Sequence, residues 1–455
     1  MQIIEAKQVL TPKGWKADLQ VHIGDDGRIE RVRERGASSA LTVDLLLPAP
    51  TNLHSHAFQR AMSGLTEARG PDPSDSFWTW RRLMYRYLDQ LTPDHVQTIA
   101  EMVFMEMLET GYASVAEFHY LHHGVGGAPY TNQAEMSERI VAAAQNTGIG
   151  LTLLPVLYQF GGCNKRALEG GQRRFGCTPD RFVELHAQAL AAIKKGGADF
   201  SIGVAPHSLR AVDEDGLAAT LSLTGEGPIH MHLAEQIAEV EEVQAHTGAR
   251  PTKWLLENYP VDANWCLIHC TQMSPDETRG LAQTGAVAGL CPITELSLGD
   301  GIFNGIQYLG EGGAFGVGSD SNIHISLFDE LRTLEYSQRL RDRSRAALAT
   351  QVKSTGRVLF EGAVQGGAQA AKRASGEIIE GAWADLIGIS TDNPWLCSRQ
   401  GDTALDSLIF GGHGNDCIEH VWSAGRHMVS NGLHSDRERI MRAFQSTVEQ
   451  LGQDI

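Results

Sequence analysis

Two histidines with a single residue between them, His54 and His56, follow a short apolar run in the first part of the chain. Side chains two positions apart on an extended backbone point to the same side, so both imidazoles can bind one cation. An isolated His-x-His is also typical of polar residues at a strand end. A third histidine, His232, and a carboxylate, Asp320, follow later apolar runs, and the four residues together predict a catalytic divalent-metal site.

A second histidine, His230, would lie on the same strand face as His232. Of the two, His232 is closer to the predicted strand end and is followed three positions later by Glu235. We therefore predict that His232 is the ligand and that His230 is a buried, hydrogen-bonded core residue. The ligand types alone suit iron and manganese as well as zinc.

The elements that must position these residues are eight short apolar runs with amphipathic segments between them. The runs cover residues 43–47, 113–118, 150–157, 200–206, 228–233, 265–269, 286–291 and 314–319. Three intervening segments open with Ser or Thr, Pro and Asp, at Thr92, Thr178 and Ser274, as helices do. Eight strand–helix units predict a (β/α)₈ TIM-like barrel of the α/β class, with a doubly wound open sheet as the alternative.

The two ends of the chain do not fit the barrel pattern. Residues 1–45 and 376–435 contain further short strand-like pieces, and we expect them to pair into a small β-sandwich domain beside a catalytic barrel of residues 46–375. A C-terminal helix is expected over residues 436–455. The irregular stretch 66–76 would be the first loop of the barrel, where it can reach over the active site.

Composition excludes several classes of partner. The chain has 38 Lys and Arg against 55 Asp and Glu, a formal net charge of −17, which argues against nucleic acid and against an anionic membrane surface. The first thirty residues contain no apolar stretch typical of a signal peptide, and no run of 18 apolar residues occurs. The seven cysteines are odd in number and show no disulfide spacing, so we expect reduced thiols and a cytoplasmic protein.

Several other cysteines and histidines could bind a metal, but their positions predict structural roles. Cys266 and Cys270 are an odd number of positions from His269, so with His269 facing inward they should point outward into the helix layer as packing residues. His122 and His123 extend from a strand end into a loop, where a solvated position is favoured over metal ligation.

The string PAPTNLHSH at residues 48–56, with His232, His269 and Asp320, resembles the amidohydrolase superfamily in its mononuclear-metal deaminase branch. More specific strings resemble the formimidoylglutamate deiminases of that branch: SHAFQRAM (55–62), DSFWTWR (75–81), AEFHY (116–120), HSLR (207–210) and GDGIF (299–303). The resemblance covers nearly the whole chain. Two places depart from it, Ala49 where glycine is usual and Leu296-Ser297 where Ala-Asn is expected, and neither is a predicted ligand.

The resemblance implies one zinc ion per chain, bound by four side chains: His54, His56, His232 and Asp320. It further implies that Asp320 accepts a proton from the attacking water, that Glu235 protonates the departing nitrogen and that His269 steadies the attacking oxygen. Taken by itself, Glu235 could instead be a carboxylate that stabilises the start of the next helix.

The implied substrate is N-formimino-L-glutamate, a dianion of histidine degradation, converted to N-formyl-L-glutamate and ammonia. Its carboxylates suit arginine, so Arg81 and Arg210 are the candidate contacts, helped by Gln59, Tyr120 and His207. Arg81 could equally be a surface charge. Deamination of a purine or pterin ring, and a metal-containing scaffold without turnover, are the rival interpretations. A homodimer is expected by analogy with the family.

Overall fold

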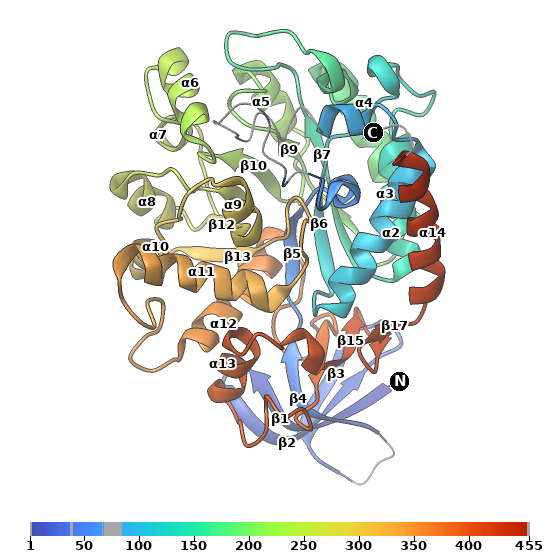
Figure 1. The fold of residues 1–455 in the computed structure, drawn as a ribbon, viewed down its shortest axis with the longest axis vertical. Coiled ribbons are helices and arrows are strands. Elements are labelled where there is room, and N and C mark those ends of the chain that lie inside the picture. The colour runs from blue at the N-terminus through green and yellow to red at the C-terminus, as the bar shows by residue number, and fades with distance from the viewer. Residues whose placement is uncertain (1, 37–39, 66, 68–83, 453–455) are drawn as a thin grey trace.

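The computed structural model describes residues 2–36, 40–65, 67 and 84–452. Arg81, the string DSFWTWR and nearly all of the predicted loop at 66–76 lie outside the described residues. Figure 1 shows a large upper part, in which helices lie around strands, and a smaller sheet below it that contains strands from both ends of the chain. None of the helices in the described ranges combines the length and the apolar content that crossing a bilayer requires.

The smaller sheet joins the two ends of the chain in one hydrogen-bonded order, β17-β16-β15-β14-β4-β1-β2-β3. Its strands are β1 (Gln2–Thr11), β2 (Gly14–Ile23), β3 (Ile29–Glu34), β4 (Leu41–Pro48), β14 (Leu386–Ile389), β15 (Ile418–Ser423), β16 (Arg426–Ser430) and β17 (Leu433–His434). The predicted pairing of the two ends is confirmed, since β4 lies antiparallel to β14. The sequence predicted a sandwich, whereas the described strands form one continuous sheet.

One predicted barrel strand is wrong. Residues 43–47 belong to β4 of the smaller sheet, and the parallel strands of the larger part begin with β5 (Thr51–Ser55), which follows β4 after the two residues Ala49-Pro50. β4 contains the apolar residues Val43 and Leu45–Leu47, whereas β5 is fully buried but has Leu53 as its one apolar residue. Because the strands were predicted from apolar runs, the prediction found β4 and passed over the buried but polar β5.

The larger part contains two groups of parallel strands. One consists of β5, β6 (Ser114–His119), β7 (Gly150–Leu157) and β8 (Ser201–Ile202), with β9 (Ala205–Pro206) also paired to β7. The other consists of β10 (Ile229–Leu233), β11 (Trp265–His269), β12 (Val287–Leu290) and β13 (Ala314–Val317). Single parallel bridges join Ser55 to Asp320 and Val204 to Ile229, so the two groups touch at both edges. The seven other predicted runs coincide with these strands.

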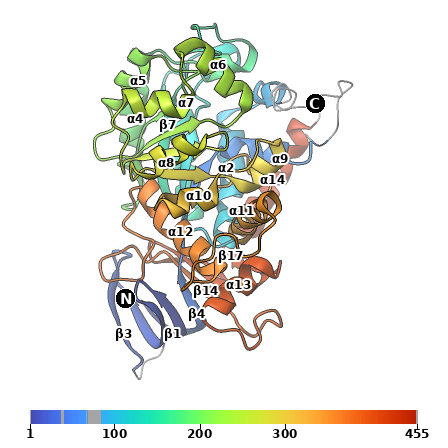
Figure 2. The same ribbon diagram turned by 90° about the vertical axis from the view of Figure 1, so that its left-hand side faces the viewer.

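Helices surround the parallel strands in both views (Figure 2). The structure contains α2 (Pro93–Glu109), α3 (Glu135–Thr147), α4 (Pro179–Ile193), α5 (Glu214–Leu221), α6 (Ile237–Thr247), α7 (Pro251–Asn258), α8 (Pro275–Ala282), α9 (Pro292–Leu298), α10 (Gly305–Gly310), α11 (Leu327–Asp342), α12 (Thr355–Ala370), α13 (Asp402–Phe410) and α14 (Arg437–Leu451). Of these, α13 lies lower, beside the smaller sheet, and α14 packs against α2 (Figure 1). The three predicted starts are confirmed, because Thr92, Thr178 and Ser274 each accept a hydrogen bond from the amide three residues later.

The two cysteines of β11 and its end are both buried and unpaired, as expected of packing residues. The prediction that both point toward the helices is wrong for Cys266, whose side chain converges with those of Leu53 and Ile268 over Gly289. Cys270 lies instead in the main core. Its φ is 54°, and that of the preceding His269 is 73°, so the alternation of an extended strand stops at this point.

Candidate active site

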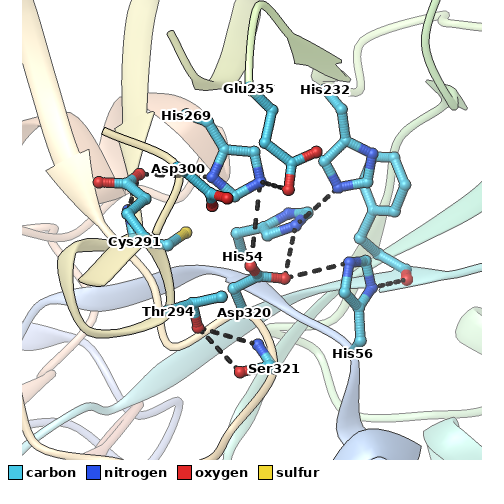
Figure 3. A network of polar contacts seen from close by, with 12 residues as sticks. His54, His56, His232, Glu235, His269, Cys291, Thr294, Asp300, Asp320 and Ser321 are labelled. Atoms are coloured by element: carbon cyan, nitrogen blue, oxygen red, sulfur yellow. Dashed lines mark hydrogen bonds and ion pairs between the residues drawn. The ribbon is translucent and has the colours of Figure 1, made fainter. Parts of the chain in front are cut away.

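The four predicted ligands meet at the carboxyl ends of the parallel strands (Figure 3). The His54 Nε2 atom lies 3.1 Å from His232 Nε2 and 3.5 Å from Asp320 Oδ1, and His56 Nε2 lies 3.2 Å from the same oxygen. All four side chains are buried. Three imidazoles and one carboxylate therefore direct their donor atoms at one small volume, as the ligands of a single ion do.

Backbone pairing sets the position of Asp320 against β5. The Asp320 amide donates to the His54 carbonyl, and the His56 amide donates to the Asp320 carbonyl, each at 2.9 Å. The close approach requires glycine at position 318, because a Cβ there would lie 2.6 Å from the His54 nitrogen. Asp320 itself has a φ of 45°, so the chain turns sharply and presents the carboxylate to the histidines.

The protonation states fit metal ligation. Burial lowers the pKa of His54 to about 3 and lowers the pKa values of His56 and His232, so all three imidazoles are neutral at neutral pH. Burial raises the pKa of Asp320, but its hydrogen bond with His54 and its electrostatic interactions with His54, His56 and His269 outweigh this and hold the pKa well below its usual range. Neutral imidazoles and an ionised carboxylate are the forms that coordinate a divalent cation.

A further carboxyl group, Glu117 of β6, supports the ligands from behind. Its Oε1 accepts a hydrogen bond of 2.7 Å from the Ala57 amide, directly after His56, and burial raises its pKa to about 8. The His56 ring lies with Nδ1 2.9 Å from the Phe118 carbonyl oxygen. Such partners fix the orientation of a ligating imidazole. Sequence reasoning quoted Glu117 within a string but gave it no role.

Glu235 and His269 lie together beside the ligands. The His269 Nε2 atom is 3.7 Å from Glu235 Oε1 and 3.9 Å from Asp320 Oδ2, and its Nδ1 lies 3.3 Å from the Glu295 carboxylate. Burial lowers the pKa of His269, but the three carboxylates raise it well above its usual value. Glu235 was alternatively expected to stabilise the start of the next helix. At the start of α6, however, the backbone amide of Glu235 donates a hydrogen bond to the carboxylate of Glu239.

The predicted substrate contacts line the same cavity as the metal ligands. Gln59, Tyr120, His207 and Arg210 border a hollow of about 620 Å³, including its open mouth. The Gln59 amide donates to the Tyr120 hydroxyl at 2.7 Å, and the buried Arg210 Nε has no hydrogen-bond partner among the described residues. Sequence reasoning missed the remaining lining residues: Met84, Tyr85, Tyr158, Phe175, Leu298 and Ser321.

The other histidines of the region have structural positions. His230 is buried and its Nε2 lies 2.7 Å from the Ala370 carbonyl oxygen, which confirms its prediction as a core residue. His122 and His123 were expected in solvent, and this is wrong. Both are about 1% exposed, and their Nε2 atoms lie 2.8 Å from the carbonyl oxygens of Val156 and Gly176, because the segment around Arg174 covers them.

Comparison with known proteins extends these findings to the whole chain. The amidohydrolase family profile matches residues 45–428, so the chain belongs to this metal-dependent family. The chain is 44% identical to the formimidoylglutamate deiminase of Pseudomonas aeruginosa, over 99% of this chain and 100% of that protein.

Two solved structures are similar over nearly their full lengths. The crystal structure of an amidohydrolase from Brucella melitensis has a TM-score of 0.94 at 43% identity, over 99% of this chain and 100% of that one. The adenosine deaminase of Xanthomonas campestris with bound zinc has a TM-score of 0.81 at 20% identity, over 99% and 98%, and shares the fold alone.

Proposed function

We propose that the protein hydrolyses N-formimino-L-glutamate to N-formyl-L-glutamate and ammonia, a step of histidine degradation. The observation that carries the proposal is the convergence of three histidines and Asp320 with Glu235 and His269 on one cavity. The full-length similarity to the Pseudomonas aeruginosa deiminase supports the choice of substrate. The reaction adds water across the C=N bond of a linear amidine and releases its terminal nitrogen.

We propose one zinc ion per chain, held by four side chains: His54, His56, His232 and Asp320. When bound, such an ion would lower the pKa of water toward about 7 and so would supply a hydroxide nucleophile at neutral pH. The three nitrogen donors and one oxygen donor suit zinc, and their buried, neutral imidazoles are ready to coordinate.

The remaining polar groups divide the proton transfers. We propose that Asp320 accepts the proton of the attacking water, because it lines the cavity and its Oδ2 lies 3.9 Å from His269 Nε2. Glu235 donates a proton to the formimino nitrogen, and burial raises its pKa, so that it can hold that proton. His269 stabilises the oxygen as charge develops on it, while Glu295 orients its ring.

We propose that arginine and other polar side chains hold the two substrate carboxylates. We propose Arg210, with His207, Tyr120 and Gln59, on the described wall of the cavity, and Arg81 as the second arginine. The net charge of −17 repels a dianion, so binding requires this local cluster of donors.

We also propose the architecture of the protein, its oligomeric state and its cellular location. The two edge bridges support a closed (β/α)₈ barrel. Because β4 belongs to the smaller sheet, we propose that the barrel begins at β5 and not at residue 46, that it extends to residue 375, and that the smaller domain comprises residues 1–48 and 376–435, followed by the last helix within 436–455. We further propose a cytoplasmic homodimer that binds neither nucleic acid nor membranes.

The direct test is ammonia release from N-formimino-L-glutamate by zinc-loaded protein, with chelated protein as the control. We expect turnover that depends on the metal and that exceeds turnover of guanine. Faster deamination of guanine would contradict the assignment, and metal binding without any turnover would favour the scaffold interpretation.

A further inference from the structure

The loop Gly299-Asp300-Gly301, which follows α9, has no role in the proposed reaction although it reaches the site. Asp300 is only 2% exposed, and an oxygen of its carboxyl lies within 4.8 Å of both the Glu235 carboxyl and the His269 ring nitrogen (Figure 3). The carboxyl does not line the substrate cavity in the described structure. It therefore stands behind Glu235 and His269 and can act on the reaction only through them.

Three polar contacts anchor Asp300 to the segments that carry its neighbours. Its Oδ1 accepts a hydrogen bond from the side chain of Gln236, the residue directly after Glu235. Its carbonyl accepts from the side chain of Gln272, which lies just beyond the end of β11. Its amide donates to the Glu295 carbonyl at 3.0 Å. One residue thus links the chain at Glu235, the end of β11 and α9.

The second carboxyl oxygen of Asp300 has no such anchor. Oδ2 is buried and has no hydrogen-bond partner among the described residues. The charged groups that act on Asp300 are Glu235, His269, Glu295 and Asp320. Burial and the charge of Glu235 raise the pKa of Asp300 to about 9, so at neutral pH it is an uncharged acid with a proton to donate.

We propose that Asp300 is a positioning residue for Glu235. Its Oδ1 holds Gln236 in place, and its unpaired Oδ2 is the atom that would donate to the nearby Glu235 carboxyl when substrate binds and so keep that side chain turned toward the metal ligands. Catalytic hydrogen bonds are often long in a free enzyme and shorten when the substrate binds. The inference rests on the proposed function, because only there does Glu235 deliver a proton.

The test compares Asp300→Ala with Asp300→Asn in the full-length, zinc-loaded protein. Alanine removes both the acceptor and the donor, so kcat should fall about 100-fold, the cost of a misplaced catalytic group. KM should change by less than about threefold and zinc content should stay at the wild-type value. Asparagine keeps an acceptor and a donor, so kcat should remain within about fivefold of wild type.

The control is Glu330→Gln, which also changes a buried carboxyl to an amide. Glu330 lies on α11, accepts a hydrogen bond from the Ile293 amide and belongs to none of the described groups around Glu235. Its kcat should equal that of wild type. Equal losses in the two Asp300 variants, a change mainly in KM, or an unchanged kcat in Asp300→Ala would each overturn the proposal.

Two further measurements keep the test decisive. If Asp300→Ala fails to fold, Gln236→Leu removes the anchor alone and should lower kcat about tenfold without a change in KM; wild-type kcat would overturn the proposal. If the wild-type protein releases no ammonia, the proposed function fails, but a crystal structure of Asp300→Asn beside Gln236→Leu still tests the positioning. We expect Glu235 to keep its wild-type rotamer only in Asp300→Asn, and the same rotamer in both variants would overturn the inference.

Discussion

Two clusters of buried polar side chains lie at opposite ends of the parallel strands, and they differ in how completely their atoms are paired. The ligand cluster consists of His54, His56, His232, Glu235, His269 and Asp320 at the carboxyl ends. The Arg373 network consists of Asp199, Arg373, Asp385 and Arg426, between the amino ends of the strands and the smaller sheet.

In the Arg373 network every charge has an opposite partner at close range. Arg373 donates to the Asp385 carboxylate at 2.6 and 3.0 Å and to Asp199 Oδ2 at 3.1 Å. Arg426 donates to both oxygens of Asp199, at 2.9 and 2.7 Å. Two cations face two anions, so the network connects the two parts of the molecule without leaving an unbalanced charge.

The buried polar atoms of the ligand cluster are paired less completely. The buried Nδ1 atoms of His54 and His232 have no hydrogen-bond partner among the described residues. The backbone is left-handed at His269 and Asp320, with φ values of 73° and 45°. Buried polar groups that stay unpaired cost stability, and residues in such conformations add to that cost. The difference indicates that the network serves stability and the cluster serves binding and chemistry.

The largest effect should come from Glu235→Gln in the ligand cluster. The amide cannot transfer the proton that the leaving nitrogen needs, so kcat should fall about 10³-fold. Zinc content and Tm should stay near wild type, because the substitution changes few contacts. Steady-state ammonia release, metal analysis and calorimetry measure the three quantities. A large drop in Tm would contradict the contrast between the two clusters.

Arg373→Met should have the opposite effect: it should lower the stability and leave kcat unchanged. Removing one partner of a buried ion pair leaves uncompensated charge on Asp199 and Asp385, which costs about 3–5 kcal/mol. The free energy of unfolding, measured in urea, should fall by that amount while kcat of the folded enzyme is unchanged. Arg439→Met is the control, because Arg439 is half-exposed and its buried partner Glu101 keeps hydrogen bonds from Gln97 and Asn146, so the substitution should cost less than about 1 kcal/mol.

Arg210→Met tests the binding side of the cluster with a smaller effect. Loss of a charged donor to a substrate carboxylate should raise KM about 10- to 100-fold, equivalent to roughly 1.5–3 kcal/mol. Arg166→Met, in a half-exposed arginine outside the cavity lining, should leave KM as it is. If KM and kcat of Arg210→Met both equalled wild type, the carboxylate contact would be refuted.

The same comparison explains what the sequence could predict about the fold. Seven apolar runs located the strands from β6 to β13, because burial on both faces of a parallel strand produces a continuous apolar signal. The assignment of residues 43–47 failed, since β5 is buried but carries polar residues, and the apolar run just before it belongs to β4 of the smaller sheet. The Arg373 network had no sequence signal at all, because its members come from four distant segments.

The site residues were predicted from their spacing in the sequence and from their position at or after the end of a predicted strand. His54, His56, His232 and Asp320 meet both conditions, and the structure brings them together. Glu295 and Asp300 lie on α9 and in the loop after it, where a carboxylate is ordinarily a solvated group. Only the packing of α9 against the end of β11 gives them a place near His269, and that packing is invisible in a single sequence.

The smallest predicted effect is the pH dependence of the Arg373 network. Burial raises the pKa of Asp199, but hydrogen bonds from Arg426 and the charge of Arg373 outweigh it and lower the pKa below 3.8. A carboxyl whose folded pKa is depressed contributes stability above the unfolded pKa and loses it as pH falls through the folded value.

Asp199→Asn should therefore be less stable than wild type at pH 6, and the difference in the free energy of unfolding should narrow as pH falls below about 4. Urea unfolding of both proteins between pH 3 and pH 7 measures this difference. The ligand cluster does not contribute to this pH-dependent difference between the two proteins. Asp199 lies at the other end of the strands, and its hydrogen-bond partners are Arg373 and Arg426. A difference independent of pH would show that Asp199 acts through packing and not through its charge.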